Sequence, residues 1–110
     1  MFNEMRFNDD VELRLGTGND LRLFHNGNNS FIDNYGGNLQ IRTHNTDEDI
    51  ILKTDDGSGG TTNYIVCDGS TGAVRLFHYG SIKLETTSAG VTVTGDITAY
   101  ESDDTSENSI

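Results

Sequence analysis

Asp68–Ala99 reads DGSTGAVRLFHYGSIKLETTSAGVTVTGDITA, and the pattern of this stretch predicts the fold class. Apolar and polar residues alternate in it four times, and small clusters that contain glycine separate the runs. Successive side chains of a strand point to opposite faces, so each run predicts a strand with one apolar face. Glycine supplies the positive φ values that tight reversals need. The stretch therefore predicts short antiparallel strands in rapid succession. These strands are Ala73–Phe77, Ser81–Glu85, Val91–Thr94 and Asp96–Ala99.

The same pattern extends toward the N-terminus, where clusters of Gly, Asn and Asp separate six further runs. The strands predicted there are Val11–Leu15, Leu21–Phe24, Ser30–Asp33, Leu39–Thr43, Asp49–Lys53 and Asn63–Cys67. Their apolar side chains, such as Leu23 and Ile41, are expected to face inward. Asn26-Gly27 predicts a type I′ hairpin turn, and Thr54–Thr62 is expected to be the longest and most flexible connection. Ten short strands without proline predict an all-β fold of antiparallel meanders.

A seven-residue segment occurs twice in the chain. Leu21–Gly27 (LRLFHNG) and Val74–Gly80 (VRLFHYG) share five identities at an offset of 53 residues. The repeat predicts a β-rich domain over residues 11–99 with two related halves, each a meander. Residues 1–10 fit either one helical turn or an extended segment, and we expect them to be an N-terminal lead-in or an attachment segment. Residues 100–110 are expected to form a polar C-terminal tail.

The composition favours an assembly of several copies. Apolar residues make up 33% of the chain, and adding the 13 glycines only reaches the bottom of the usual range for globular domains. Most apolar residues occupy alternating positions, which predicts a thin layered structure without a thick core. Such a chain often needs copies of itself to bury its apolar faces.

Charge and cysteine content exclude several classes of function. A net charge of −11 argues against general nucleic-acid binding and against an anionic membrane surface, since both need Lys and Arg. No apolar run is long enough to cross a membrane, and the first residues lack the apolar region of a signal peptide. We therefore expect a protein that is made in a cytoplasm. The single cysteine, Cys67, is expected to be a buried reduced thiol.

No motif predicts a catalytic, cofactor-binding or metal-binding residue, and the chain is expected not to be an enzyme. Gly16–Leu21 fits one copy of the calcium-binding nonapeptide of β-rolls, but no second copy follows in phase. Asp55–Gly60 lacks the ligand spacing of an EF-hand and is expected to be a solvated turn. His25, His44 and His78 have no zinc spacing within one chain. They are interpreted as strand-end residues, or as residues that a threefold assembly brings to its axis.

Four segments together resemble the shafts of tail fibres and tailspikes of tailed bacteriophages, especially phages of marine bacteria. These segments are Asp20–Ile32, Gly37–Arg42, Asp68–Val74 and Gly90–Ala99, and the resemblance spans residues 11–99. It implies a homotrimeric β-prism or β-helix-like fibre or knob, located in the virion. It also implies host attachment, with other virion proteins bound through the N-terminus.

The C-terminal end departs from this family. In the family, the run matched by Thr92–Ala99 leads into an intramolecular chaperone of the endosialidase type, which cuts itself off before a serine. Ser102 matches that serine, but Thr105–Ile110 does not continue the family pattern. Self-cleavage is therefore not carried over to this chain.

Several functions remain open beside a trimeric attachment module. The short length favours a capsid or tail decoration or adaptor protein. A polysaccharide-degrading tailspike fragment, with sites at subunit interfaces, and a calcium-binding β-roll are further alternatives. Tyr35, Tyr64 and Tyr79 are the candidate contacts to a receptor, which is expected to be a host surface polysaccharide or protein.

Overall fold

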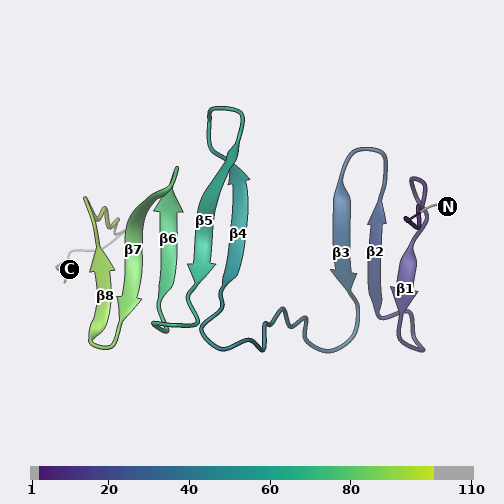
Figure 1. Cartoon of the computed structure of the whole chain (residues 1–110), viewed down its shortest axis with the longest axis horizontal. Coiled ribbons are helices and arrows are strands. Elements are labelled where there is room, and N and C mark those ends of the chain that lie inside the picture. Colours follow the sequence, from purple (N-terminus) through teal and green to yellow (C-terminus); the bar gives the residue numbers. More distant parts are fainter. Residues whose placement is uncertain (1–2, 101–110) are drawn as a thin grey trace. The chain divides into compact units, whose positions relative to one another are not determined.

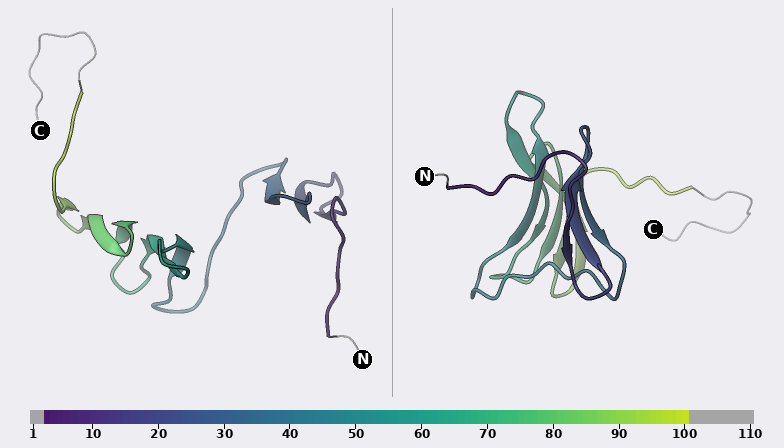
Figure 2. Two further views of the ribbon diagram at one scale, coloured as in Figure 1. Left: turned by 90° about the horizontal axis from the view of Figure 1, so that it is seen from above. Right: turned by 90° about the vertical axis from the view of Figure 1, so that its right-hand side faces the viewer.

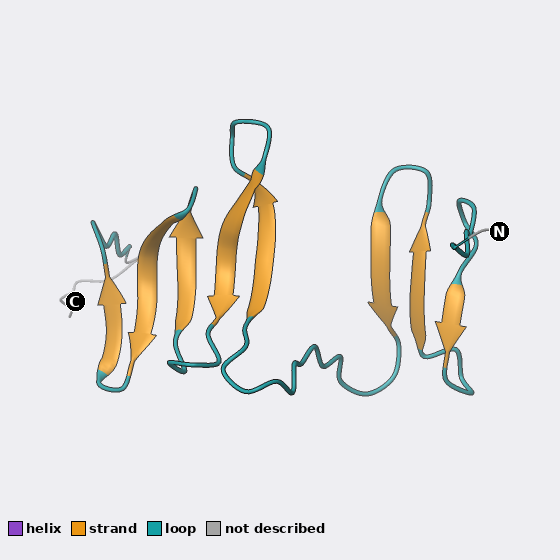
Figure 3. Ribbon diagram, viewed as in Figure 1, coloured by secondary structure: helices purple, strands orange, loops and turns teal. Residues whose placement is uncertain are grey.

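The computed structural model describes residues 3–100, and this part of the chain contains strands and turns but no helix (Figure 3). Among these residues there is accordingly no helix that is long and apolar enough to cross a membrane. The predicted all-β class is confirmed. The strands are β1 (Leu13–Leu15), β2 (Leu21–His25), β3 (Ser30–Asn34), β4 (Ile50–Asp55), β5 (Thr61–Cys67), β6 (Val74–His78), β7 (Ser81–Thr87) and β8 (Gly90–Val93).

The chain divides into two compact units, Met1–Gln40 and Ile41–Ile110. The first unit contains a three-stranded sheet in the order β1-β2-β3, and the second a five-stranded sheet in the order β4-β5-β6-β7-β8 (Figure 1). Every strand within a sheet pairs antiparallel with the next one along the chain. Each sheet is a single layer when it is seen along its strands (Figure 2, left). The repeated segment forms β2 in one unit and β6 in the other.

Each sheet has one apolar face and one face of mixed polarity. Directly paired residues project to the same side, so each row of partners lies on one face. We call the side that carries the following row the apolar face of the five-stranded sheet. Its row of partners crosses all five strands: Leu52, Ile65, Leu76, Leu84 and Val93. The neighbouring row on the opposite face is more polar: Ile51, Val66, Arg75, Glu85 and Thr92. In the three-stranded sheet, Leu13, Leu23 and Ile32 share one side, and Arg14, Arg22 and Asp33 share the other.

Very little apolar surface is buried within one chain. Val66 and Ala73, at 4% and 7% exposure, are the buried apolar residues of the described chain. The predicted inward orientation of Leu23 and Ile41 is wrong for the single chain, because these side chains are 36% and 66% exposed. For Leu23, the physical reason is that its sheet is one layer thick, so the apolar face has no second layer to pack against. Ile41 lies in the connection between β3 and β4 and belongs to no sheet. Alternation predicts which side is apolar, and it does not predict what covers that side.

Two of the predicted strands are not strands in the described chain. Leu39–Thr43 lies in the connection between β3 and β4, and Asp96–Ala99 follows β8, the last strand of its sheet. Both segments alternate, but a strand also needs a neighbouring backbone with which to exchange hydrogen bonds. The prediction that Thr54–Thr62 is the longest connection is also wrong. β4 and β5 extend into that segment, and the connection over residues 35–49 is longer.

The predicted type I′ turn at Asn26-Gly27 is wrong as well. Gly27 has a φ of 93°, but Asn26 does not have the positive φ that a type I′ turn requires at both central residues. Instead, the Asn26 side chain accepts hydrogen bonds from the backbone N–H groups of Asn28 and Asn29, at 3.0 and 2.8 Å. The asparagine therefore closes the β2–β3 hairpin with its side chain.

A type I′ turn occurs at the equivalent place in the second unit. Tyr79 and Gly80 have φ values of 43° and 81°, and they connect the paired residues His78 and Ser81. A two-residue loop with positive φ at both positions has the geometry of this turn. The repeat thus forms a hairpin in both units, with different turns.

The described part of the N-terminal segment, residues 3–10, is neither helix nor strand. Met5 and Phe7 are 84% and 46% exposed in it. The helical alternative for this segment therefore does not hold for these residues. Ser102 and the rest of the predicted tail beyond Tyr100 lie outside the described residues.

Candidate functional site

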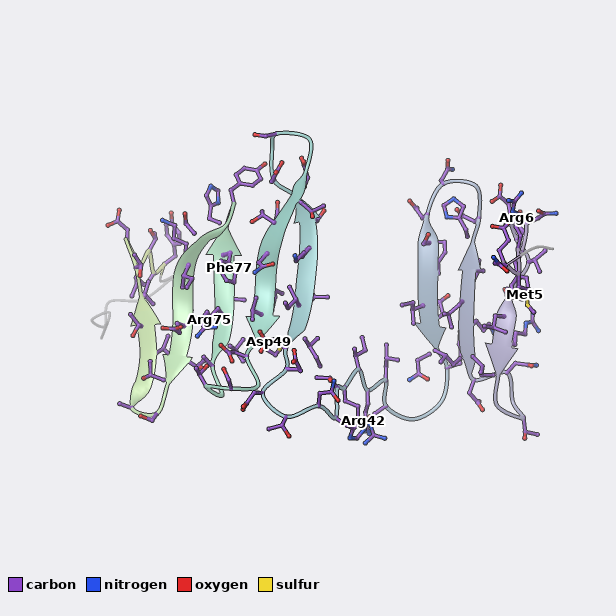
Figure 4. The ribbon with its side chains drawn as sticks, viewed as in Figure 1. Met5, Arg6, Arg42, Asp49, Arg75 and Phe77 are labelled. Atoms are coloured by element: carbon purple, nitrogen blue, oxygen red, sulfur yellow. The ribbon has the colours of Figure 1, made fainter. Side chains whose placement is uncertain are left out.

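Aromatic side chains of the second unit line a cavity of about 230 Å³, formed by Tyr64, Phe77, His78 and Tyr79. We call it the aromatic cavity. The rings of Tyr64 and Tyr79 meet edge to face, with centroids 6.4 Å apart and an interplanar angle of 83°. The His78 ring lies 5.3 Å from the Tyr79 ring. Phe77 lies on β6 close to the end that leads into the Tyr79 turn (Figure 4).

Two irregularities of strand pairing occur beside the aromatic cavity. The pairing between β4 and β5 passes from Ile65 to Asn63 and skips Tyr64. The pairing between β6 and β7 skips Lys83, next to the partner of Phe77. Such β-bulges place an extra residue in one strand and change the direction of nearby side chains. They allow Tyr64 to leave the regular pattern of the sheet and contact Tyr79.

The loop between β4 and β5 fixes the ring of Tyr64. The Tyr64 hydroxyl donates a hydrogen bond of 2.8 Å to the backbone oxygen of Asp55. The loss of solvent around this hydroxyl raises its pKa, and the nearby Tyr79, Asp55 and Asp56 raise it further. The aromatic cavity therefore lies in an acidic environment.

The same loop is closed by its own carboxylate. The Oδ1 atom of Asp56 accepts hydrogen bonds from the backbone N–H groups of Gly60 and Ser58, at 3.0 and 2.7 Å. These bonds lower the pKa of Asp56, so the carboxylate is charged at neutral pH. Gly57 lies against Tyr79, because a Cβ atom on Gly57 would be 3.5 Å from the Cζ atom of that ring. The loop thus brings negative charge close to the rings.

A second cluster surrounds Arg75 on the more polar face of the same sheet (Figure 4). Its guanidinium donates to Glu85, its cross-strand partner, and to Oδ2 of Asp68 at 2.7 Å. The Ser70 hydroxyl and then Arg75 lower the pKa of Asp68 well below its usual range. The carboxylate also accepts the backbone N–H of Thr71 at 3.1 Å. These contacts tie the β5–β6 turn to the sheet, which is a structural role.

Cys67 lies near this turn, and the prediction of a buried thiol is wrong. The residue is exposed, in a shallow hollow of about 250 Å³ whose lining also includes Ile50 and Val74. Cys67 pairs with both of these residues, so it shares the apolar face with them. The thiol is exposed because that face is uncovered in the single chain.

The remaining predicted site residues are not part of the lining of the aromatic cavity. Tyr35 belongs to the first unit, where the Arg22 guanidinium lies over its ring at 4.5 Å. His25 pairs with the Ser30 hydroxyl at 3.0 Å, and His44 lies in the long connection between β3 and β4. Within residues 3–100, no group of three or more His, Cys, Asp or Glu side chains is placed to hold a metal ion.

The structure brings Tyr64 and Tyr79 together and adds Phe77 and His78. Sequence reasoning did not propose Phe77, and it considered His78 only as a strand-end residue or as a residue on a threefold axis. One sequence signal pointed to this place. The repeat aligns Tyr79 with Asn26, so an aromatic residue precedes glycine where the other copy has a common turn residue.

The chain was compared with models of protein families, with curated proteins and with solved structures, and none of these comparisons found a match. Function is therefore inferred from the residues and the geometry described above.

Proposed function

We propose that the chain is a non-enzymatic structural component of a phage virion, a homotrimeric module of a tail fibre or spike that serves host attachment. The observation that carries the assembly is the uncovered apolar face of the five-stranded sheet. The virion location, the number three and the attachment role are supported by the resemblance of residues 11–99 to phage fibre shafts.

The apolar face offers enough surface to drive association. Leu52, Ile65, Leu76 and Val93 are 54%, 36%, 40% and 37% exposed in the single chain. Full burial of one such side chain stabilises by about 1.5–3 kcal/mol. Covering the exposed part of the row therefore contributes about 2.5–5 kcal/mol per chain, before the cost of association is subtracted.

The distribution of charge favours contact through the same face. The chain carries a net charge of −11, so its copies repel one another at random orientations. The apolar row itself is uncharged, whereas Arg75 and Glu85 lie on the opposite side of the sheet. Three single-layer sheets with their apolar faces toward a common axis would share one thin core.

Other virion proteins are proposed to bind the N-terminal segment. Met5 and Phe7 expose apolar side chains there, next to the surface ion pair of Arg6 and Glu4 at 2.8 Å. An exposed Met and an exposed Phe on a chain end suit a docking segment better than a solvated tail. The candidate contacts to the receptor are then Tyr35, Tyr64 and Tyr79.

Leu76→Lys tests the assembly, because it places a charge in the middle strand of the apolar row. We expect wild type to be a trimer by native mass spectrometry and this variant to be a monomer at micromolar concentration. Thr92→Lys is the matched control, since Thr92 pairs with Glu85 on the other face and should leave the trimer intact. A folded wild-type monomer at micromolar concentration would overturn the proposal.

Electron microscopy of the isolated oligomer separates the fibre from the alternative assembly. An elongated rod with threefold symmetry supports the fibre or spike module. A ring or a surface lattice supports a capsid or tail decoration or adaptor protein instead. Release of reducing ends from host capsular polysaccharide would contradict the non-enzymatic role and favour a tailspike fragment.

A further inference from the structure

We propose that the aromatic cavity binds an organic ammonium group, such as a quaternary or methylated ammonium, through the faces of its rings and the neighbouring carboxylates. All the residues concerned belong to the second unit of one chain. The proposal therefore does not depend on the assembly or on the virion role proposed above.

The backbone of Tyr79 is the first reason to assign a ligand to this place. Its φ of 43° lies in the left-handed region, which is unfavourable for a bulky aromatic residue and much more common for asparagine. The repeat has Asn26 at the equivalent position, so the chain itself contains the residue that suits such a turn better. Strained residues of this kind concentrate at functional sites. The ring of Tyr79 therefore has a functional role, which offsets the unfavourable left-handed backbone conformation of this residue.

The bulges provide a second, independent reason. Bulges interrupt the sheet at Tyr64 and at Lys83, on the two strands that flank β6. Each bulge weakens strand pairing locally and is common next to binding sites, where it redirects a side chain. The turn and the two bulges together build an open cavity of about 230 Å³ from four rings.

The negative charges near the aromatic cavity indicate the class of ligand. A cation over an aromatic face is attracted by the electron density of the ring, and cages of several rings recognise quaternary ammonium groups. The charges of Asp55, at the end of β4, and Asp56, on the adjoining loop, act on the hydroxyl of Tyr64, so they favour a cation and disfavour an anion at the rings. The same chain already places a cation on a tyrosine, since Arg22 lies over Tyr35. A neutral sugar would stack on the rings and could donate hydroxyl hydrogen bonds to a carboxylate, but it would gain no attraction between opposite charges.

Choline chloride is the probe, titrated into the wild-type protein at constant ionic strength and followed by NMR of the tyrosine rings. We expect saturable shifts with a Kd on the order of 1 mM, as several partly exposed cation–π contacts would provide. The neutral analogue of choline, in which a tert-butyl group replaces the trimethylammonium group, should bind at least about tenfold more weakly. Equal binding of the two compounds, or no binding of choline, would overturn the proposal.

Tyr79→Asn is the decisive variant, because it should stabilise the turn while it removes the ring. We expect a thermal midpoint at or above that of wild type, an unchanged oligomeric state, and choline affinity reduced at least about tenfold. Tyr79→Phe retains the ring and should keep the affinity within about twofold. Tyr35→Ala removes a tyrosine of the first unit and should change nothing in the titration.

The same variants separate the ammonium group from other ligands. Binding of neutral hexoses that Tyr79→Asn abolishes, without binding of choline, would identify a sugar site and refute the ammonium assignment. Choline binding that survives Tyr79→Asn would place the site elsewhere and refute the proposal equally.

Discussion

Asp68 shows how single residues hold the turns of this thin sheet. Its carboxylate accepts hydrogen bonds from the Ser70 hydroxyl and from Arg75, at 2.7 Å each. These contacts keep its pKa below the ordinary value of 3.8. A depressed pKa in the folded state stabilises that state above the unfolded pKa, and the stabilisation is lost as pH falls through 3.8 toward the folded value.

Asp68→Asn should therefore lower the denaturation midpoint near neutral pH, because it removes the charge that Arg75 contacts. The difference from wild type should shrink as pH falls and should vanish well below about pH 3, where Asp68 itself becomes protonated. Chemical denaturation at a series of pH values measures this. A difference that stays constant with pH would contradict the role assigned to the carboxylate.

At the scale of elements, two segments have the pattern of strands but no strand to pair with. Leu39 and Ile41 are 49% and 66% exposed in the first segment, and Ile97 is 56% exposed in the second. Both segments connect to sheet edges, where backbone N–H and C=O groups are open to pairing with another chain. They are therefore the elements that assembly should change most.

Hydrogen exchange tests this expectation. In the trimer, amides of residues 39–43 and 96–99 should exchange at least about tenfold more slowly than in the monomeric Leu76→Lys variant. Amides of β5 and β6, which pair within one chain, serve as the internal reference, because their exchange in the variant shows how far its overall stability falls. Equally fast exchange of the two segments in both proteins would show that they remain unpaired after assembly.

At the scale of the whole molecule, folding and association are expected to be coupled. Val66 and Ala73 are the buried apolar side chains of the described chain, which is a small core for the burial that folding needs. Most of the apolar contact must then come from neighbouring copies, so stability should depend on protein concentration.

The thermal midpoint should rise with concentration for this reason. For a trimer, a tenfold increase in chain concentration contributes about 1 kcal/mol per chain, which raises the midpoint by about 4 °C or more. Scanning calorimetry over a hundredfold range of concentration measures the shift. The Leu76→Lys variant should be less stable and independent of concentration, and a wild-type midpoint that does not move would contradict coupled folding.

The fold class and the positions of the strands follow from the amino-acid pattern alone. Alternation is a local property, since neighbouring side chains of an extended backbone always point to opposite faces. It therefore located all eight strands of the described chain to within a few residues, and it indicated which side of each strand is apolar. It also marked Tyr64 and Tyr79 as candidate contacts and showed the repeat.

The amino-acid pattern does not show which of the alternating runs pair as strands or which side chains come into contact. These features depend on the three-dimensional fold. Leu39–Thr43 alternates as well as its neighbours do, but pairing depends on a backbone that lies far away along the chain. The type I′ turn formed at Tyr79 and not at Asn26, because the asparagine side chain closed its own hairpin. The aromatic cavity depends on two bulges, which arise from the register between strands. Register is a relation between distant residues, and no local pattern of one strand contains it.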